Sequence, residues 1–370
     1  MELVAEFVRL CEIESVSRNE RAMADAVGAE LRALGLEVSE DASGSETGSN
    51  AGNLLARIPG PDGSRTILLC AHLDTVPLDA PVDVEEVEGV LRNRNEAILG
   101  ADNKAAVAVI LAAARRLVGN GAGLAPVGIE ILFTTCEEHA LRGAKEFDLE
   151  QLRSEYGYVF DHASPIGEVI VAAPTYFSIE GRFRGKAVHA GICPEKGHSA
   201  IEAAAAAVAA MKLGRLDPQT TTNVGRIEGG TASNVVAERC YVQCEARSID
   251  HERAGAVATW IVDAMTEAAS DRECDLEIHV EELFRGYKVP RSAAPVQVAE
   301  RALADAGFEP QPISTGGGSD ANAFQARGFP CVNLANGTKG AHQPDESVTV
   351  DALERMLDVV LGLVRHSAAA

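Results

Sequence analysis

Polar side chains with metal-binding chemistry follow several strand-like apolar segments of this 370-residue sequence. His72 and Asp74 follow the apolar run ILLCA, and as residues i and i+2 of an extended chain they point the same way. A carboxylate in that position can hydrogen-bond the ring of a metal-ligating histidine and orient it. The pair alone is weak evidence, because a polar strand end requires no metal.

Asp102, in the segment GADNKAAVAV, lies at the start of a predicted helix over residues 103–118. One interpretation is a helix N-cap, a position at which aspartate is common. The other is a carboxylate whose two oxygens bridge two metal ions about 3.5–4 Å apart. The residues around Asp102 leave both interpretations open.

Acidic residues and a late histidine follow three further predicted strands. Glu137 and Glu138 follow the run VGIEILFTTC, Asp161 ends YVFD, and His342 lies in a glycine-flanked loop after FPCVNLA. The glutamate pair is either solvated surface or a metal ligand beside a group that reaches the metal-bound water. Sites gather at the carboxyl ends of strands in open α/β sheets, so together these motifs predict one metal site.

Composition excludes several classes of function. The formal net charge is −22, from 33 basic and 55 acidic residues, which argues against nucleic acid and anionic membrane surfaces as partners. No run of 18 strongly apolar residues predicts a transmembrane helix, and the start MELVAEFVRLCEIESVS lacks the features of a signal peptide. The eight cysteines form no CxxC pair, which favours buried reduced thiols and a cytoplasmic location.

The order of predicted elements indicates two domains. Strands and helices alternate before residue 175 and again after Tyr287, which predicts an α/β sandwich with a central mixed sheet. Between them, half-exposed strands and helices near 199–213 and 251–269 follow the β-α-β-β-α-β order of a ferredoxin-like α+β domain. We therefore expect a catalytic domain, residues 1–174 and 286–370, interrupted by an inserted domain, residues 175–285.

Seven motifs carry a family resemblance over nearly the whole chain. In chain order they are HLDTVP, GADNK, CEEHALRGAK, FDHAS, GGTASNVVAERC, GGGSDAN and GTKGAHQPDE. Together they resemble the peptidase-T-like branch of the co-catalytic dizinc peptidase family, which includes tripeptide aminopeptidases, glutamate carboxypeptidases and aminoacylases. The resemblance implies a zinc-peptidase-like fold, an inserted lid and dimerisation domain, and a cis peptide bond after Asp102.

The resemblance also implies a centre of two metal ions. It assigns His72 and Asp161 to one metal, Glu138 and His342 to the other, and Asp102 to both. Two histidines and three carboxylates suit Zn²⁺, and Co²⁺ or Mn²⁺ could substitute.

Within this implied centre, Glu137 is the general base for a metal-bridging water and Asp74 orients His72. The expected activity is that of a tripeptide aminopeptidase-like exopeptidase acting on short peptides. Related dizinc amidohydrolases remain the alternative: a carboxypeptidase, an N-acyl amino acid deacylase or a desuccinylase. A non-catalytic metal-stabilised scaffold is disfavoured, because it would lack the base or a ligand, and all six positions are present.

The inserted domain is expected to contribute substrate-binding residues. His189 resembles a histidine that reaches the partner subunit's site in homodimers, Arg247 one that binds a substrate carboxylate, and Asn234 one that contacts substrate. In the run 316–318, Gly317 and Gly318 would let the backbone approach a ligand closely. The alternatives are a polar strand end, an edge-strand ion pair, a turn residue and a plain flexible loop.

Three residues depart from the family pattern without removing a ligand. His139 and His162 stand where small or aliphatic residues are frequent, and Asn103 replaces a frequent acidic residue. We interpret them as tolerated variation, the alternative being residues that tune charge or substrate preference.

Overall fold

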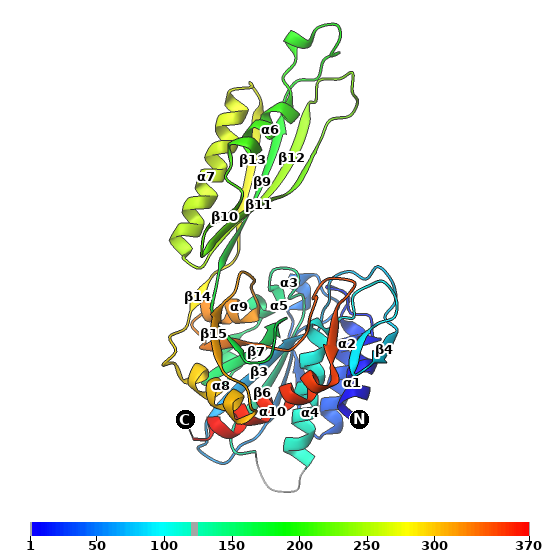
Figure 1. Ribbon diagram of the computed structural model, residues 1–370, viewed down its shortest axis with the longest axis vertical. Coiled ribbons are helices and arrows are strands. Elements are labelled where there is room, and N and C mark those ends of the chain that lie inside the picture. The colour runs from blue at the N-terminus through cyan, green and yellow to red at the C-terminus, as the bar shows by residue number, and fades with distance from the viewer. Residues whose placement is uncertain (1, 120–124, 370) are drawn as a thin grey trace. The chain divides into compact units, whose positions relative to one another are not determined.

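The computed structural model describes residues 2–119 and 125–369 (Figure 1). The chain divides into two compact units, each described by itself below. Unit 1 comprises Met1–Val171, Val289–Ser314 and Ser319–Ala370, and unit 2 comprises Ala172–Lys288 and Thr315–Gly318.

A mixed sheet forms the centre of unit 1, which confirms the predicted mixed α/β architecture. The central strands β6, β3, β7 and β16 are parallel, and the strands on either side of them pair antiparallel. In spatial order its strands are β1 (Val38–Glu40), β2 (Leu54–Ile58), β6 (Gly128–Thr134), β3 (Thr66–His72), β7 (Tyr156–His162), β16 (Cys331–Ala335) and β8 (Glu168–Ala173), with β15 (Gln311–Ser314) beside β8. The two-residue strand β14 (Tyr287–Lys288) pairs with Ala172 and Ala173 at the end of β8. The parallel strands end at one edge of the sheet, where their carboxyl ends can gather side chains.

Helices cover both faces of this sheet (Figure 1). One face packs on α1 (Glu2–Cys11), α2 (Arg21–Ala33), α4 (Ala101–Gly119), α8 (Ala294–Asp305) and α10 (Val350–Ser367). The other face carries the short helices α3 (Gly44–Thr47), α5 (Arg142–Glu146) and α9 (Asp320–Ala326). Because side chains alternate along a strand, Leu69 of β3 joins the core under α4, whereas Cys70 faces Asp320 of α9.

Unit 1 also contains smaller elements outside the central sheet. The polar segment 41–53 contains the single-turn helix α3. A separate three-stranded sheet is formed by β4 (Val84–Val87), β5 (Val90–Asn93) and β17 (Ser347–Thr349). The 3₁₀ turn Leu149–Gln151 follows α5.

Unit 2 is a five-stranded antiparallel sheet with two helices packed on one face. Its strands, in spatial order, are β10 (Gly214–Asp217), β11 (Thr220–Gly229), β12 (Arg239–Ser248), β9 (Thr175–Arg184) and β13 (Asp275–Phe284). Its helices are α6 (Ala200–Ala210) and α7 (His251–Ser270), and a 3₁₀ turn spans Pro194–Lys196. The short strand β10 was not expected; it forms because Gly214, at φ 86°, turns the chain after α6 and lets Arg215 pair with Thr221.

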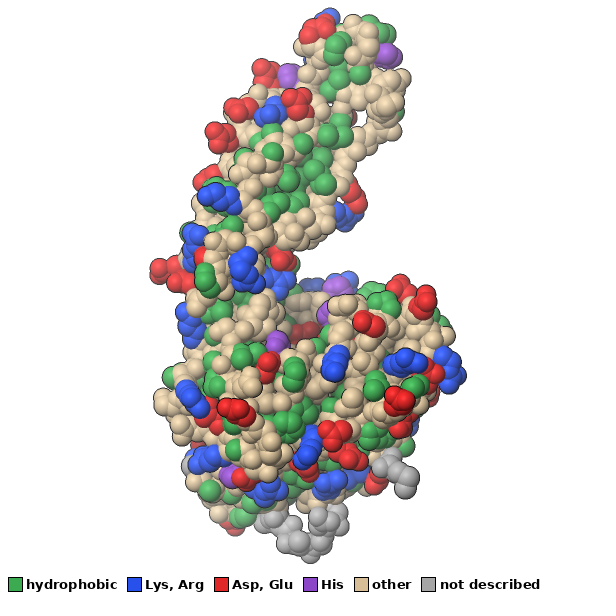
Figure 2. All heavy atoms as spheres, in the orientation of Figure 1, with side chains coloured by type: hydrophobic (Ala, Val, Ile, Leu, Met, Phe, Trp, Pro, Cys, Tyr) green, Lys and Arg blue, Asp and Glu red, His purple; other side chains and the backbone are tan. Residues whose placement is uncertain are grey.

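Charged side chains of both signs lie on the visible face of the molecule (Figure 2), and the cysteines are unpaired. On the visible face, basic side chains are interspersed with acidic ones (Figure 2). The cysteines are free thiols, and Cys70, Cys136 and Cys331 are buried. Within residues 2–119 and 125–369, no helix combines the length and the hydropathy needed to span a bilayer.

Candidate metal centre

The predicted metal-binding side chains of unit 1 converge at the carboxyl ends of the parallel strands. His72 is the last residue of β3 and Asp161 the penultimate residue of β7. Glu137 and Glu138 lie in the loop after β6, and Asp102 lies at the start of α4. His342, in the loop after β16, adopts a positive φ of 65°. Sheet topology thus joins residues up to 270 positions apart in sequence (342 − 72).

Asp102 is the side chain that contacts both histidines. Its Oδ1 lies 3.3 Å from His72 Nε2, and its Oδ2 lies 3.5 Å from His342 Nε2. The same His342 nitrogen lies 2.8 Å from Glu138 Oε1, and His72 Nε2 lies 3.5 Å from Asp161 Oδ1. One oxygen of Asp102 therefore faces His72 and the other faces His342, as is required of a carboxylate that bridges two metal ions.

The potential ligand atoms form two groups, and within each group all of the atoms lie within 4.8 Å of one another. One consists of His72, Glu137 and Asp161, and the other of His72, Asp102 and Glu138. This grouping differs from the sequence-based assignment, because Glu137 joins a group and His72 joins both. Glu137, the predicted base, therefore lies among the potential ligand atoms.

The carboxylates of this cluster are buried and close together, which disfavours ionisation of all of them at once. Burial and the charge of Asp102 raise the pKa of Asp161 to about 8, and burial with the charge of Asp161 raises the pKa of Glu137 well above its usual range. Burial opposes ionisation of Asp102, but hydrogen bonds from His342 and His72 outweigh it and lower its pKa. Hydrogen bonds to Asp102 and Glu138 raise the pKa of His342 to about 10.

These donors fit divalent cations. Imidazole nitrogens and carboxylate oxygens are the ligands that zinc and similar ions take in proteins. Crowded buried carboxylates that hold protons in the absence of a cation are the groups that a cation would compensate. The chemistry of the donor set thus agrees with a metal centre at this edge of the sheet.

Asp74 has a wider role than its predicted one. The ring of His72 makes its closer contact with the backbone carbonyl of Asp74, at 2.9 Å from Nδ1, and lies 3.4 Å from the carboxylate. The carboxylate accepts hydrogen bonds from the backbone amides of Glu137 and Glu138, at 2.9 and 3.1 Å, and from the Ser17 hydroxyl. Asp74 therefore contacts the histidine and both members of the acidic pair.

Two buried side chains that the motifs had not singled out hold the backbone of candidate ligands. Glu346 accepts hydrogen bonds from the amides of Leu99, Gly100 and Asp102, at 2.7, 2.7 and 2.8 Å. Asn333 accepts from the amide of Asp161 and donates to its carbonyl. The sequence contains only a weak sign of these two residues: Asn333 is an amide within a predicted buried strand, and Glu346 is the last residue of the motif GTKGAHQPDE.

The peptide bond after Asp102 is cis, as the resemblance implies.

Comparisons with known proteins identify the family of the chain. A model of Peptidase family M20/M25/M40 matches residues 68–366. The chain belongs to this family. Membership makes it a hydrolase of peptide bonds and confirms the sequence-based resemblance.

Three similar proteins cover nearly the whole M20 chain. The Bacillus subtilis (strain 168) protein YqjE is 35% identical over 366 residues, which are 99% of this chain and 98% of that protein. The structure of aminopeptidase PepT from Bacillus cereus ATCC 10987 has a TM-score of 0.89 at 36% identity. That of a tripeptidase from Staphylococcus aureus subsp. aureus Mu50 has a TM-score of 0.94 at 31% identity. Both structural matches cover 100% of this chain and 98% of the other.

The predicted substrate residues of the M20 peptidase lie in unit 2, in two groups. In one, the segments of His189 and Asn234 lie side by side, because the amide of Ala190 donates to the carbonyl of Asn234 at 2.9 Å; both side chains are exposed. In the other, Arg247 lies 4.0 Å from the ring centroid of Tyr176 and donates to the carbonyl of Gly316 at 3.2 Å. The two groups belong to opposite ends of β9 and β12.

The glycine run of the peptidase has a structural reason at one position. An added Cβ at Gly318 would lie 2.4 Å from the ring of Phe284, so a larger residue there would force that ring to move, and packing favours glycine. At Gly317 the nearest atom to such a Cβ, Thr315 Oγ1, is 3.8 Å away, which leaves space at that position. Of the two, Gly317 is therefore the one at which access to a ligand would explain the residue.

The three departures from the family pattern lie in different environments. His139 is exposed, whereas burial lowers the pKa of His162, whose ring lies 3.9 Å from the Glu168 carboxylate. Asn103 is fully buried, and both polar atoms of its side chain lack a hydrogen-bond partner. A polar group is therefore available beside Asp102, although the family pattern often has a carboxylate there.

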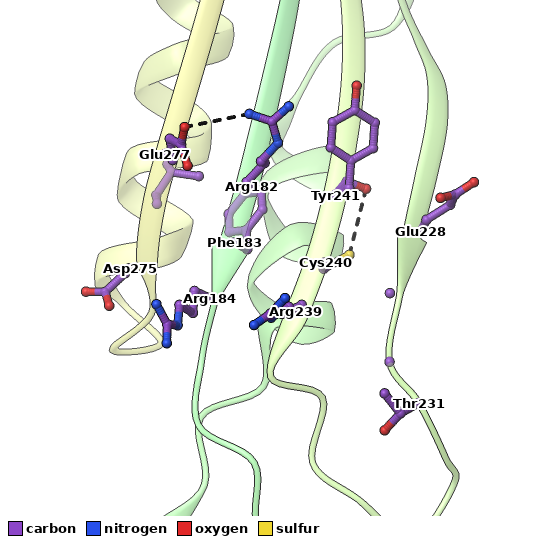
Figure 3. Close-up of a pocket in the computed structure, with 13 residues that line it drawn as sticks. Arg182, Phe183, Arg184, Glu228, Thr231, Arg239, Cys240, Tyr241, Asp275 and Glu277 are labelled. Atoms are coloured by element: carbon purple, nitrogen blue, oxygen red, sulfur yellow. Dashed lines mark hydrogen bonds and ion pairs between the residues drawn. The ribbon is translucent and has the colours of Figure 1, made fainter.

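A cavity of about 770 Å³ lies on the sheet of unit 2, apart from the predicted site residues (Figure 3). Arg184 and Arg239 lie directly opposite each other on β9 and β12, and the Tyr241 ring lies 5.9 Å from the guanidinium carbon of Arg182. Arg182 also pairs with Glu277 at 3.6 Å. The charges that line this cavity are therefore mixed.

Replacing Glu346 with alanine is expected to weaken metal binding by about 10–100-fold, as losses of such supporting hydrogen bonds do. Three buried amides, including that of Asp102, would lose their acceptor, so the melting temperature is also expected to fall. Competition with a chromophoric chelator measures the affinity. The matched control is Glu354→Ala on the exposed side of α10. Equal affinities for the two variants would contradict the role of Glu346.

Proposed function

We propose that this M20 peptidase is a two-metal exopeptidase that acts on short peptides in the manner of a tripeptide aminopeptidase. The observation that carries the proposal is the double contact of Asp102, whose two oxygens face His72 and His342 separately. The similarity to an aminopeptidase PepT and to a tripeptidase over the whole chain supports the choice of substrate.

The proposed ligands are the five residues expected from the sequence, with Zn²⁺ as the metal. They are His72, Asp102, Glu138, Asp161 and His342. Two bound cations would lower the pKa of the attacking water and polarise the scissile carbonyl. The neutralised charge would in turn keep the surrounding carboxylates ionised at neutral pH.

Glu137 is the proposed general base. It is 8% exposed, and its backbone amide is fixed by the Asp74 carboxylate at 2.9 Å. Its carboxylate would accept a proton from the attacking water and deliver it to the leaving amine. Its position in one of the two groups of donor atoms is consistent with this task, since a base must lie within hydrogen-bond reach of that water.

Unit 2 is proposed to act as a lid and to form a homodimer. Arg247 is held by the Tyr176 ring and the Gly316 carbonyl and pairs with Glu245 at 3.0 Å. Its guanidinium is proposed to bind the carboxylate of a peptide. His189 is exposed on a segment that pairs with Val235, so a partner subunit could reach it, and its proposed role is to donate to the oxyanion formed in the partner. Asn234 and Gly317 are proposed to contact substrate.

A substrate panel tests the activity. We expect release of the N-terminal residue from Ala-Ala-Ala, slower turnover of Ala-Ala, and no turnover of N-acetyl-Ala-Ala-Ala, whose amine is blocked. N-acetyl and N-succinyl amino acids test the amidohydrolase alternative with the same metal centre. Amino-acid analysis of the products measures the outcome. Turnover of acylated amino acids in the absence of peptide turnover would overturn the exopeptidase assignment.

A further inference from the structure

The loop 135–138, which carries the acidic pair, is held by side chains at every backbone amide. The amide of Thr135 donates to Asn53 Oδ1 at 3.0 Å, and that of Cys136 donates to Glu20 Oε1 at 3.0 Å. The amides of Glu137 and Glu138 donate to the two oxygens of Asp74. Backbone amides bond mostly to backbone carbonyls. Four consecutive amides that donate to side chains instead indicate that residues elsewhere in the chain fix the position of this loop.

The turn at Cys136 makes this external support necessary. Cys136 has a φ of 51°, in the left-handed region that a residue with a Cβ rarely adopts. It is fully buried, so its amide has no water to replace a lost acceptor. The turn sits directly before Glu137 and Glu138, and any relaxation of it would move both carboxylates.

Glu20 is built into the interior beneath this turn. Its side chain is 0% exposed, and its second oxygen, Oε2, accepts a hydrogen bond from the Ser49 hydroxyl. The Cys136 thiol also lies 3.4 Å from Glu20 Oε1. A buried carboxylate with these partners has no solvent contact and touches none of the candidate ligands through its own oxygens.

Close packing leaves the loop little room on its other side. An added Cβ at Gly143, in α5, would lie 2.0 Å from the Thr135 carbonyl oxygen and 2.7 Å from Asn53 Oδ1. Asn53 in turn donates to the Gly143 carbonyl at 2.9 Å. The helix after the loop and the Asn53 side chain that holds Thr135 are thus packed together, and the amide of Cys136 is held by Glu20.

We infer that Glu20 is a positioning residue: it holds the Cys136 amide and thereby sets where the Glu137 and Glu138 carboxylates stand. The inference rests on the proposed roles of those two residues as base and ligand. A misplacement of about 1 Å at a catalytic group costs on the order of 10²-fold in rate. Loss of a group that supports a ligand costs about 10–100-fold in metal affinity or activity.

Two variants separate the reach of the Glu20 side chain from its charge. Glu20→Asp keeps the charge but is one methylene shorter, so it no longer reaches the Cys136 amide. Glu20→Gln loses the charge but keeps an oxygen for that amide, and its NH₂ group can donate to Ser49. We expect kcat to fall by about 10–100-fold in Glu20→Asp with KM within threefold of wild type, and to stay within about fivefold in Glu20→Gln.

Glu130 provides the matched control. It is also buried, at 1% exposed, and its carboxylate accepts from the Arg153 and Ser154 amides and pairs with Arg57. These partners are not in the loop 135–138. Glu130→Asp is therefore expected to lower the melting temperature as much as Glu20→Asp does, with kcat and metal affinity within twofold of wild type.

The experiment measures zinc affinity of each metal-free variant by chelator competition, together with kcat and KM on the best wild-type substrate. Zinc binding at least tenfold weaker in Glu20→Asp than in Glu20→Gln and Glu130→Asp supports the inference. Equal affinities of Glu20→Asp and Glu130→Asp overturn it, as does a Glu20→Gln protein as impaired as Glu20→Asp. Should wild type hydrolyse no peptide, the proposed function fails, while the zinc affinities still decide the role of Glu20.

Discussion

Replacing Glu137 with glutamine is expected to lower kcat by about 10²–10⁴-fold, the usual contribution of a general base. Glutamine keeps the shape of the side chain and the backbone amide that donates to Asp74, but it accepts no proton from water. Steady-state kinetics on a tripeptide measures the loss. The matched control is Glu150→Gln, an exposed glutamate outside the cluster, which should retain wild-type kcat.

Metal content distinguishes a base from a ligand in this variant. Glu137 lies in one group of donor atoms with His72 and Asp161, so it could also bind metal directly. If it is the base, elemental analysis of Glu137→Gln gives the same two metal ions per chain as wild type. A loss of one equivalent would show that Glu137 is a ligand, and wild-type kcat would remove it from the mechanism.

Asp102→Asn is expected to lower kcat/KM by at least about 10³-fold, because a metal ion supplies several kcal/mol of transition-state stabilisation. Each 1.36 kcal/mol corresponds to a factor of ten in rate. An amide has one oxygen acceptor, so it cannot serve the His72 and His342 sides of the centre equally. We therefore expect metal content to fall below two equivalents per chain.

An exposed aspartate gives the control for that variant. Asp351, whose side chain is 83% exposed, lies in the first turn of α10, and in the described structure its carboxylate pairs only with Arg355 of the same helix. Asp351→Asn should keep full metal content and activity. Full metal content in Asp102→Asn as well would favour the helix N-cap interpretation of Asp102 over the bridging carboxylate.

The sequence by itself determined the mixed α/β architecture and the candidate ligands. The architecture follows from local patterns, because apolar runs specify buried strands, and the polar residues directly after them lie where parallel strands end. His72 and Asp161 could be found in this way because each lies at the end of its own strand. The assignment of five of these residues as metal ligands came from the family resemblance of the motifs. Asp102 remained ambiguous, since an N-cap and a bridging carboxylate have the same local sequence.

The tertiary structure alone decided which residues support the ligands. Glu20 is 116 residues from the Cys136 amide that it accepts from, Asn333 is 172 residues from Asp161, and Glu346 is 244 residues from Asp102. No local pattern predicts such partners, because a buried acceptor is defined by the chain that folds against it. Strand ends can be predicted from the periodicity of apolar residues. The hydrogen bonds that hold the loop 135–138 form only when the folded chain places distant acceptors beside its amides.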